Sequence, residues 1–173
     1  MRLALILMLV VWQINPPPVI NVVTDQAVSL SDFRGAKAVV VIFTSNVCAY
    51  DAYYPDRLKS LFTAYSATTQ FVLVNSYTEA DETPDRMKSK YASWGFDGVP
   101  YLADKDQVWM KALGARKTPE VFVLDSNLKV VYNGAIDDNP QLANAVKENY
   151  LKKVLDGATV ANTRAVGCSI RSK

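Results

Sequence analysis

The sequence predicts an α/β protein in which a mixed central β-sheet is flanked by helices on both faces. In the first part of the chain, continuous apolar runs typical of strands buried on both faces alternate with segments of helical periodicity. Further on, two apolar runs are separated only by the turn residues Ser126 and Asn127, which indicates an antiparallel hairpin. Parallel crossovers followed by a hairpin give a mixed sheet with helices on both faces.

The individual elements follow from local signals. Gly35 precedes a β-branched strand at 38–44, and 70–76 is the second buried strand. Between them 49–67 has helical periodicity, and Pro55 marks either a kink or the start of that helix. The remaining elements are predicted as a helix capped by Thr83-Pro84 and ending before Gly95, a strand at 101–103, a helix at 107–113, hairpin strands at 120–125 and 128–134, and a closing helix from Asn139-Pro140 to Val154. This order is that of the thioredoxin fold.

Composition narrows the chemistry that the chain can perform. The 173 residues, half of them apolar, are enough for one core, and we expect one domain at 19–156 followed by a tail at 157–173. The net charge is +2 and the basic residues form no stripe along the sequence, so we expect no nucleic-acid partner. The absence of histidine excludes Ser–His–Asp and Cys–His catalysis, and two cysteines cannot form a Cys₄ metal site. We expect no metal and no cofactor.

The N-terminal segment 1–18 is predicted to be a signal peptide. Arg2 is followed by ten uncharged, mostly aliphatic residues, Leu3 to Trp12, which is the length of a signal-peptide core and too short to span a bilayer. The alternative is a hydrophobic first strand or helix of the fold. Export to a periplasm or secretion would place the cysteines where disulfides persist, and would leave no membrane span in the mature chain.

Cys48 is the candidate nucleophile. It follows the predicted buried strand and is expected to open a helix, where free N–H groups and the helix dipole favour a thiolate. Asp51, three residues later, stands where a second cysteine is usual, and its charge favours the protonated thiol. The alternative is a small buried cysteine without chemistry.

Thr118-Pro119 is the second signal, because it lies immediately before a predicted strand. A proline there indicates either a cis bond or the first residue of the strand. In thioredoxin-fold enzymes a cis-proline in this place packs against the active cysteine and presents backbone groups to the substrate. We therefore expect Thr118 and Pro119 to bind the substrate.

Three stretches carry a resemblance to a known family: "LSDFRGAKAVVVIFTSNVC", "GARKTPEVFVLDSNLKVVYNGAIDDN" and "TRAVGCSI". Over about 30–170 the chain resembles the peroxiredoxin-like, redoxin branch of the thioredoxin superfamily. This resemblance implies a thiol–disulfide oxidoreductase. Members commonly read Asn-His-Cys-Pro, where this chain has Asn46, Val47, Cys48 and Ala49.

Two further functions stay open beside disulfide exchange. A peroxidase needs donors around the thiolate, and Ser45 can fill the hydroxyl place of the peroxiredoxin signature, although Val41 replaces its proline. Tyr50 can line a substrate groove beside Cys48, or can pack with the helix. A non-catalytic binding module is the remaining possibility. We expect protein or small-molecule thiols and disulfides as partners, and peroxide for the alternative.

Cys168 is the only possible intramolecular partner of Cys48. It can resolve a mixed disulfide or a sulfenic acid on Cys48, or form a structural disulfide in an exported protein. A third possibility is that the two sulfur atoms never meet.

Two clusters of acidic residues are expected to have no role in metal binding or catalysis. Asp137, Asp138 and Asn139 are interpreted as a turn and N-cap rather than a calcium site. The charges at 81, 82 and 85 are interpreted as solvated groups around a helix start.

Overall fold

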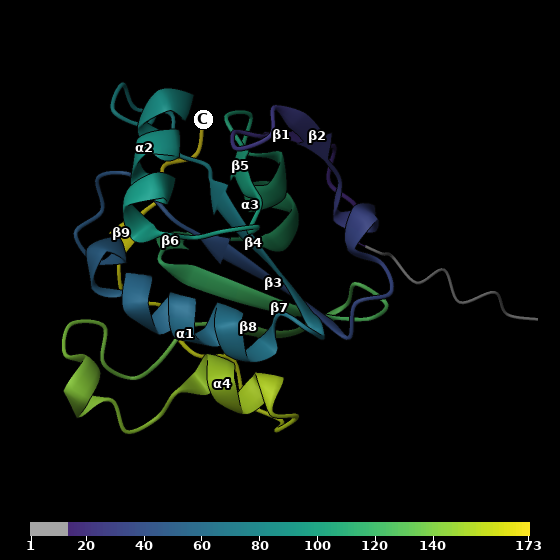
Figure 1. Cartoon of the computed structure of the whole chain (residues 1–173), viewed down its shortest axis with the longest axis vertical. Helices are drawn as coiled ribbons and strands as arrows, with labels where there is room; N and C mark the ends of the chain where they lie inside the picture. Colours follow the sequence, from purple (N-terminus) through teal and green to yellow (C-terminus); the bar gives the residue numbers. More distant parts are fainter. Residues whose placement is uncertain (1–13) are drawn as a thin grey trace, which may run out of the picture.

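The computed structural model describes residues 14–173, and its centre is one seven-stranded sheet in the order β2-β1-β5-β4-β3-β7-β8 (Figure 1). Strands β3, β4 and β5 are parallel, whereas β7 runs antiparallel to both β3 and β8. The strands are β1 (Val19–Asn21), β2 (Gln26–Val28), β3 (Ala38–Phe43), β4 (Thr69–Asn75), β5 (Tyr101–Ala103), β7 (Glu120–Asp125) and β8 (Val130–Gly134). This mixed sheet confirms the predicted fold class.

A second, two-stranded sheet joins β6 (Lys117–Thr118) to β9 (Cys168–Ser169) in the C-terminal tail. The helical segments are η1 (Leu30–Phe33), η2 (Asp51–Tyr53), α1 (Pro55–Tyr65), α2 (Pro84–Trp94), α3 (Val108–Leu113), η3 (Ala143–Ala145) and α4 (Tyr150–Leu155). The tail strand was not expected, because two residues carry too little pattern to indicate a strand.

Side chains on the two faces of the sheet form two separate cores. Because successive strand residues point to opposite faces, Val40 and Ile42 pack under α1, α2 and α4, while Val41 and Phe43 pack with α3 and η1 on the other face. Figure 1 shows the sheet lying between α1 and α3, with α4 beside α1. Helices on both faces are thus confirmed, and the sheet is buried on both sides as its apolar runs predict.

The register of the parallel strands brings their carboxyl ends to one edge. Ala38 of β3 pairs with Thr69 of β4, and the pairing continues to Phe43 and Val74. The loop that carries Cys48 leaves β3 at this edge, so the sheet positions the candidate nucleophile at the usual location of sites in such sheets.

Pro55 begins a helix rather than kinking one. It is the first residue of α1, and the short turn η2 precedes it. Of the two interpretations of Pro55, the helix start is confirmed, and residues 49–54 lie before α1. The proline explains the boundary, because its ring tolerates the first helical position and disfavours an interior one.

The predicted closing helix from Asn139 was also wrong, since α4 begins only at Tyr150. The side chain of Asp138 accepts the amides of Lys147 and Glu148, at 3.0 and 3.1 Å, and closes the preceding segment into a loop. Side chains of this type compete with helix hydrogen bonds. The periodicity of apolar residues alone does not reveal that competition.

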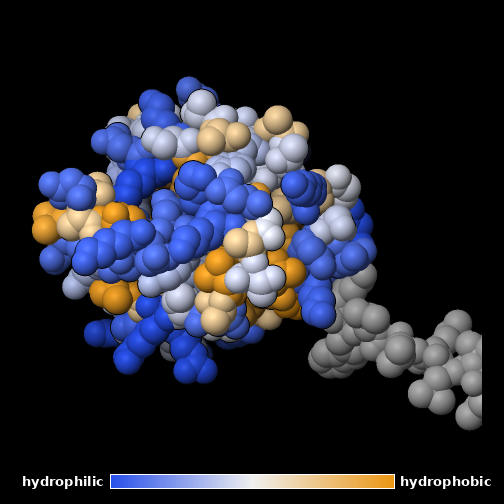
Figure 2. All heavy atoms as spheres, turned by 90° about the horizontal axis from the view of Figure 1, so that it is seen from below, coloured by the Kyte–Doolittle hydropathy of each residue, from blue (hydrophilic) through white to orange (hydrophobic). Residues whose placement is uncertain are grey.

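The face of the molecule seen from below in Figure 2 is largely polar. Figure 2 shows hydrophilic residues over most of the face viewed from below, with apolar residues in separate patches. Within residues 14–173, no helix has the length and apolar character that a membrane crossing requires. Most of the predicted signal peptide, 1–13, lies outside the described residues.

Candidate active site

Ser45 fixes the loop that carries Cys48. The amide of Thr44 donates to the Val74 carbonyl at 2.9 Å and ends the pairing of β3 with β4. The buried hydroxyl oxygen of Ser45 then accepts the amides of Val47 and Cys48, at 3.2 and 3.1 Å. The Ser45 side chain therefore stabilises the turn of this loop, and the Cys48 amide is already hydrogen-bonded to it.

Glu82 anchors this turn from the other side. Its carboxylate accepts the Ser45 hydroxyl at 2.5 Å, the Asn46 amide at 2.8 Å and the Asn75 side-chain amide at 2.7 Å. The interpretation of Glu82 as a solvated charge was wrong, because only 1 % of the residue is exposed. Three donors replace the water that a buried carboxylate loses. The neighbouring Asp81 is exposed, as expected.

Cys48 and Cys168 are joined by a disulfide, with 5.9 Å between their Cα atoms. The possibility that the sulfur atoms never meet is therefore excluded. Cys48 is only 4 % exposed, and Cys168 is half-buried. The expected placement of Cys48 at a helix start was wrong, since the helix after it begins at Pro55. Cys48 therefore does not lie at the N-terminus of α1, where the helix dipole would favour a thiolate.

The Thr118–Pro119 segment lies directly beside the disulfide. The peptide bond between them is cis, as one of the two interpretations predicts. The carbonyl oxygen of Thr118 is 3.3 Å from Cys48 Sγ. Tyr77, which sequence reasoning missed, lies beneath this segment, with its hydroxyl 3.2 Å from Thr118 Oγ1. Burial raises the pKa of Tyr77 to about 12, so the hydroxyl stays protonated.

The C-terminal tail is bound along this same segment. Cys168 of β9 is the strand partner of Thr118, and Ser169 is the partner of Lys117. Beyond the strand, Gln107 donates to the Arg171 carbonyl at 2.7 Å and accepts the Lys173 amide at 2.8 Å. Main-chain and side-chain hydrogen bonds thus hold the tail against the site, although its sequence shows no periodic pattern.

Asp51 is a buried carboxyl next to the disulfide. The residue is 2 % exposed, and its Oδ2 accepts the Ser45 amide at 3.2 Å. Burial raises the pKa of Asp51 to about 7, and the positive charge of Lys90 opposes that rise. Lys90 is itself partly buried, which lowers its pKa, and its ammonium group donates to the Ser45 carbonyl.

Of the other residues considered, Tyr50 is partly exposed and its ring meets Tyr53 edge to face, with centroids 6.4 Å apart. Tyr54 instead belongs to the core, where its hydroxyl donates to Asp137 at 3.1 Å. Asp137 also forms an ion pair with Arg57 at 2.6 Å, so protein groups already occupy its carboxylate. Across 14–173, no cluster of three histidine, cysteine or acidic side chains has the arrangement of a metal site.

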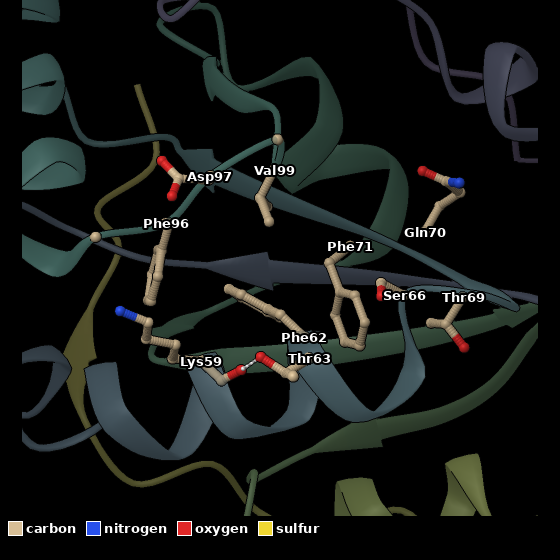
Figure 3. Close-up of a pocket in the computed structure, with 12 residues that line it drawn as sticks. Lys59, Phe62, Thr63, Ser66, Thr69, Gln70, Phe71, Phe96, Asp97 and Val99 are labelled. Atoms are coloured by element: carbon tan, nitrogen blue, oxygen red, sulfur yellow. Dashed lines mark hydrogen bonds between the residues drawn. The ribbon is translucent and has the colours of Figure 1, made fainter.

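Two hollows differ in their relation to the site. One, of about 550 Å³, borders Cys48 between its loop and α2, with Arg86 and Lys90 on its wall. The other, of about 530 Å³, lies at the start of β4, where Phe62, Phe71 and Phe96 form an apolar floor (Figure 3). Since Cys48 follows the carboxyl end of β3 and β4 is parallel to it, this second hollow is at the opposite edge of the sheet.

Together, the sheet, the cis-proline segment and the cysteine after β3 define a thioredoxin-fold protein with a disulfide at its sheet edge. The chain belongs to the Redoxin family, whose model matches residues 18–155. A search of curated proteins finds no match to the sequence.

Solved structures agree with this assignment. The chain is 29 % identical to an uncharacterised conserved protein of Geobacillus kaustophilus, with a TM-score of 0.81 over 93 % of this chain and 90 % of the other. A hypothetical protein of Sinorhizobium meliloti 1021 is 26 % identical, with a TM-score of 0.78 over 93 % of each chain. A secreted disulfide oxidoreductase of Mycobacterium tuberculosis shares the fold at 15 % identity, with a TM-score of 0.61 over 82 % of this chain and 95 % of the other.

Proposed function

We propose that the protein is a thiol–disulfide oxidoreductase that acts through Cys48, with Cys168 as the resolving cysteine. The observation that carries this proposal is the disulfide between the loop after β3 and the tail strand, beside the Thr118 carbonyl oxygen. Both sulfur atoms thus lie next to Thr118 and Pro119, which supports the proposal that these two residues bind the substrate once the disulfide is reduced.

The chemistry needs only the two thiols and a substrate disulfide. In the reducing direction, the Cys48 thiolate attacks one substrate sulfur, and the other substrate sulfur leaves as a thiolate and takes up a proton. The Cys168 thiolate then attacks Cys48 Sγ and releases the second substrate thiol. Two electrons pass from the protein to the substrate, the Cys48–Cys168 disulfide remains, and a dithiol donor reduces it again. In the oxidising direction the steps run in reverse: two substrate thiols reduce the Cys48–Cys168 bond and become a disulfide, and a disulfide oxidant then accepts the two electrons and re-forms the bond.

The surroundings of Ser45 favour exchange over peroxide reduction. A peroxidase needs free donors aimed at the oxygen that develops charge. Ser45 gives its hydroxyl proton to Glu82, and its oxygen already accepts the Cys48 amide. The hydroxyl is therefore unable to serve a peroxide in this arrangement.

Protein thiols in an oxidising compartment fit this function best. The hydrophobic segment at 1–18 supports export, and a disulfide persists outside the reducing cytosol. Among proteins of the same fold, one from Mycobacterium tuberculosis is described as secreted and one from Streptococcus pneumoniae as an exposed lipoprotein. Mass analysis of the N-terminus of the exported protein would test cleavage of the segment, and an intact Met1 would contradict it.

Two variants test the mechanism. Cys48→Ser should abolish disulfide exchange, because it removes the sulfur that attacks the substrate in the proposed mechanism. Cys168→Ser should instead accumulate a mixed disulfide on Cys48, detectable by mass after non-reducing digestion. Unchanged exchange in Cys48→Ser would contradict the proposal, and failure of Cys168→Ser to accumulate any adduct would remove the resolving role.

A further inference from the structure

The backbone of the tail touches the Thr118 carbonyl group at Gly167. A Cβ atom placed on Gly167 would lie 1.9 Å from the Thr118 oxygen, 2.7 Å from its carbon and 3.2 Å from the Pro119 nitrogen. Real Cβ atoms do not approach other atoms closer than 3.0 Å, and here the neighbours are backbone atoms that cannot rotate away. Glycine is therefore required before Cys168 for the tail to lie where it does.

Main-chain and side-chain groups hold the tail as an extended strand on either side of this contact. Beyond Cys168, the Ile170 amide donates to the Arg116 carbonyl at 2.9 Å. The ammonium group of Lys117 donates to the Gly167 carbonyl at 3.4 Å and to the Ser169 hydroxyl at 3.0 Å. Addition of an extended peptide to a short strand is a common mode of peptide recognition, in which main-chain bonds give affinity and side-chain space gives selectivity.

We propose that the tail occupies the groove in which the substrate binds, and that the substrate is an extended protein segment in which glycine directly precedes the reactive cysteine. This inference rests on the proposed function, since it takes Thr118 and Pro119 as the substrate-binding residues. The sequence Val166-Gly167-Cys168-Ser169 then acts as a built-in copy of the substrate. Lys117 adds a preference for a hydrogen-bond acceptor after the cysteine.

One groove cannot pair with two strands at once. A substrate segment therefore replaces the tail at β6 while its sulfur exchanges with Cys48, and the tail returns when the Cys168 thiolate releases the substrate thiol. The oxidised protein, in which the tail is tied to Cys48, has its groove closed. In the reducing direction, access for a substrate disulfide requires that the dithiol donor first break the Cys48–Cys168 bond.

A pair of peptides tests the glycine requirement on the full chain carrying Cys168→Ser. The peptides are Val-Gly-Cys-Ser-Ile and Val-Ala-Cys-Ser-Ile, each linked through its cysteine to thionitrobenzoate. Attack by Cys48 on the peptide sulfur releases the coloured thionitrobenzoate and leaves a Cys48–peptide adduct of known mass. The glycine peptide should react at least tenfold faster, because the alanine methyl group clashes with backbone atoms.

A small disulfide separates failure of this inference from failure of the proposed function. Bis(2-hydroxyethyl) disulfide has no peptide backbone to fit the groove, and the proposed function predicts that it reacts with Cys48. If it reacts and the two peptides have equal rates, the groove assignment is overturned and the function stands. If it does not react, Cys48 does not exchange and both proposals fall.

Gly167→Ala in the otherwise native chain gives an independent measurement. The substitution should lower the equilibrium constant for forming the Cys48–Cys168 bond in glutathione buffers at least tenfold, which corresponds to about 30 mV for a two-electron couple. Val166→Ala is the matched control, because Val166 is adjacent and exposed. Equal constants for both variants and the native protein would contradict the close contact at Gly167.

Discussion

The amide of Asp51 donates a hydrogen bond to the carbonyl oxygen of Cys48 at 3.2 Å, and this places a buried carboxyl one turn from the disulfide. The position is the one that a second cysteine usually holds. Because burial raises the pKa of Asp51 to about 7, the protein carries a group that titrates near neutral pH next to the Cys48–Cys168 disulfide.

Substitution of Asp51 should change how stability depends on pH. The folded carboxyl has a pKa of about 7, against an ordinary value of 3.8. Between these values the folded protein binds more protons than the unfolded chain, so the free energy of unfolding should fall as pH rises, by up to roughly 4 kcal/mol. Asp51→Asn removes this titration and should flatten the dependence.

Urea unfolding at about pH 5 and about pH 8 measures this effect in both proteins. Asp56→Asn is a matched control, because Asp56 is exposed and should leave the pH dependence as it is. A native stability that rises with pH across this window, or an Asp51→Asn variant with an unchanged slope, would contradict the assignment of a raised pKa.

Removal of the Glu82 carboxylate should destabilise the loop around Cys48. Glu82→Ala leaves the Ser45 hydroxyl, the Asn46 amide and the Asn75 side chain without their acceptor in a buried site. The free energy of unfolding should fall by at least about 3 kcal/mol, since each unpaired buried group costs about 1–3 kcal/mol. Chemical denaturation measures the loss. Asp81→Ala, at an exposed neighbour, should cost no more than about 1 kcal/mol, and equal losses would show that Glu82 has no anchoring role.

The pair of Arg57 and Asp137 should matter more than any exposed ion pair. Asp137 is fully buried, pairs with Arg57 at 2.6 Å and accepts the Tyr54 hydroxyl. Asp137→Ala leaves the Arg57 charge without its partner and should cost about 3–5 kcal/mol in thermal or urea unfolding. The exposed pair of Lys152 and Asp156 supplies the comparison, and Asp156→Ala should cost less than about 1 kcal/mol. A similar cost for both substitutions would contradict the difference in burial.

Hydrogen peroxide should oxidise the reduced protein only slowly. The hydroxyl of Ser45 is committed to Glu82 and the amide of Cys48 is committed to Ser45, so neither stabilises peroxide bond cleavage. A sulfenate-specific probe, added with stoichiometric peroxide, measures the oxidation of Cys48 in the Cys168→Ser variant. Rapid and complete labelling would support the peroxidase alternative instead.

The fold was predictable because its signals are local and strong. The strand at 120–125 and the helix from Pro84 to Trp94 have the predicted bounds. In this helix, Thr83 caps the start and Gly95 takes the left-handed conformation that ends a helix. Cys48 and Thr118-Pro119 could be singled out for a related reason, since each stands at a predicted boundary of a strand. Of the two interpretations of that proline, the cis bond is the one the structure has.

The remaining parts of the site depend on contacts between distant segments. Glu82 meets Ser45 across 37 positions, and the tail meets Thr118 through two strand residues. Neither contact leaves a periodic trace in the sequence. The one available signal for Glu82 was the polar pair Asn75 and Ser76 at the end of a buried strand, because buried polar groups need partners.

The reduction potential of the Cys48–Cys168 bond tests the central claim most directly. The protein is equilibrated with glutathione buffers, its free thiols are alkylated, and the masses give the oxidised fraction. A redox-active pair should titrate between about −120 and −270 mV, the range of disulfide-exchange proteins. A bond that stays oxidised below about −300 mV would be a structural disulfide, and it would contradict the proposed exchange through Cys48.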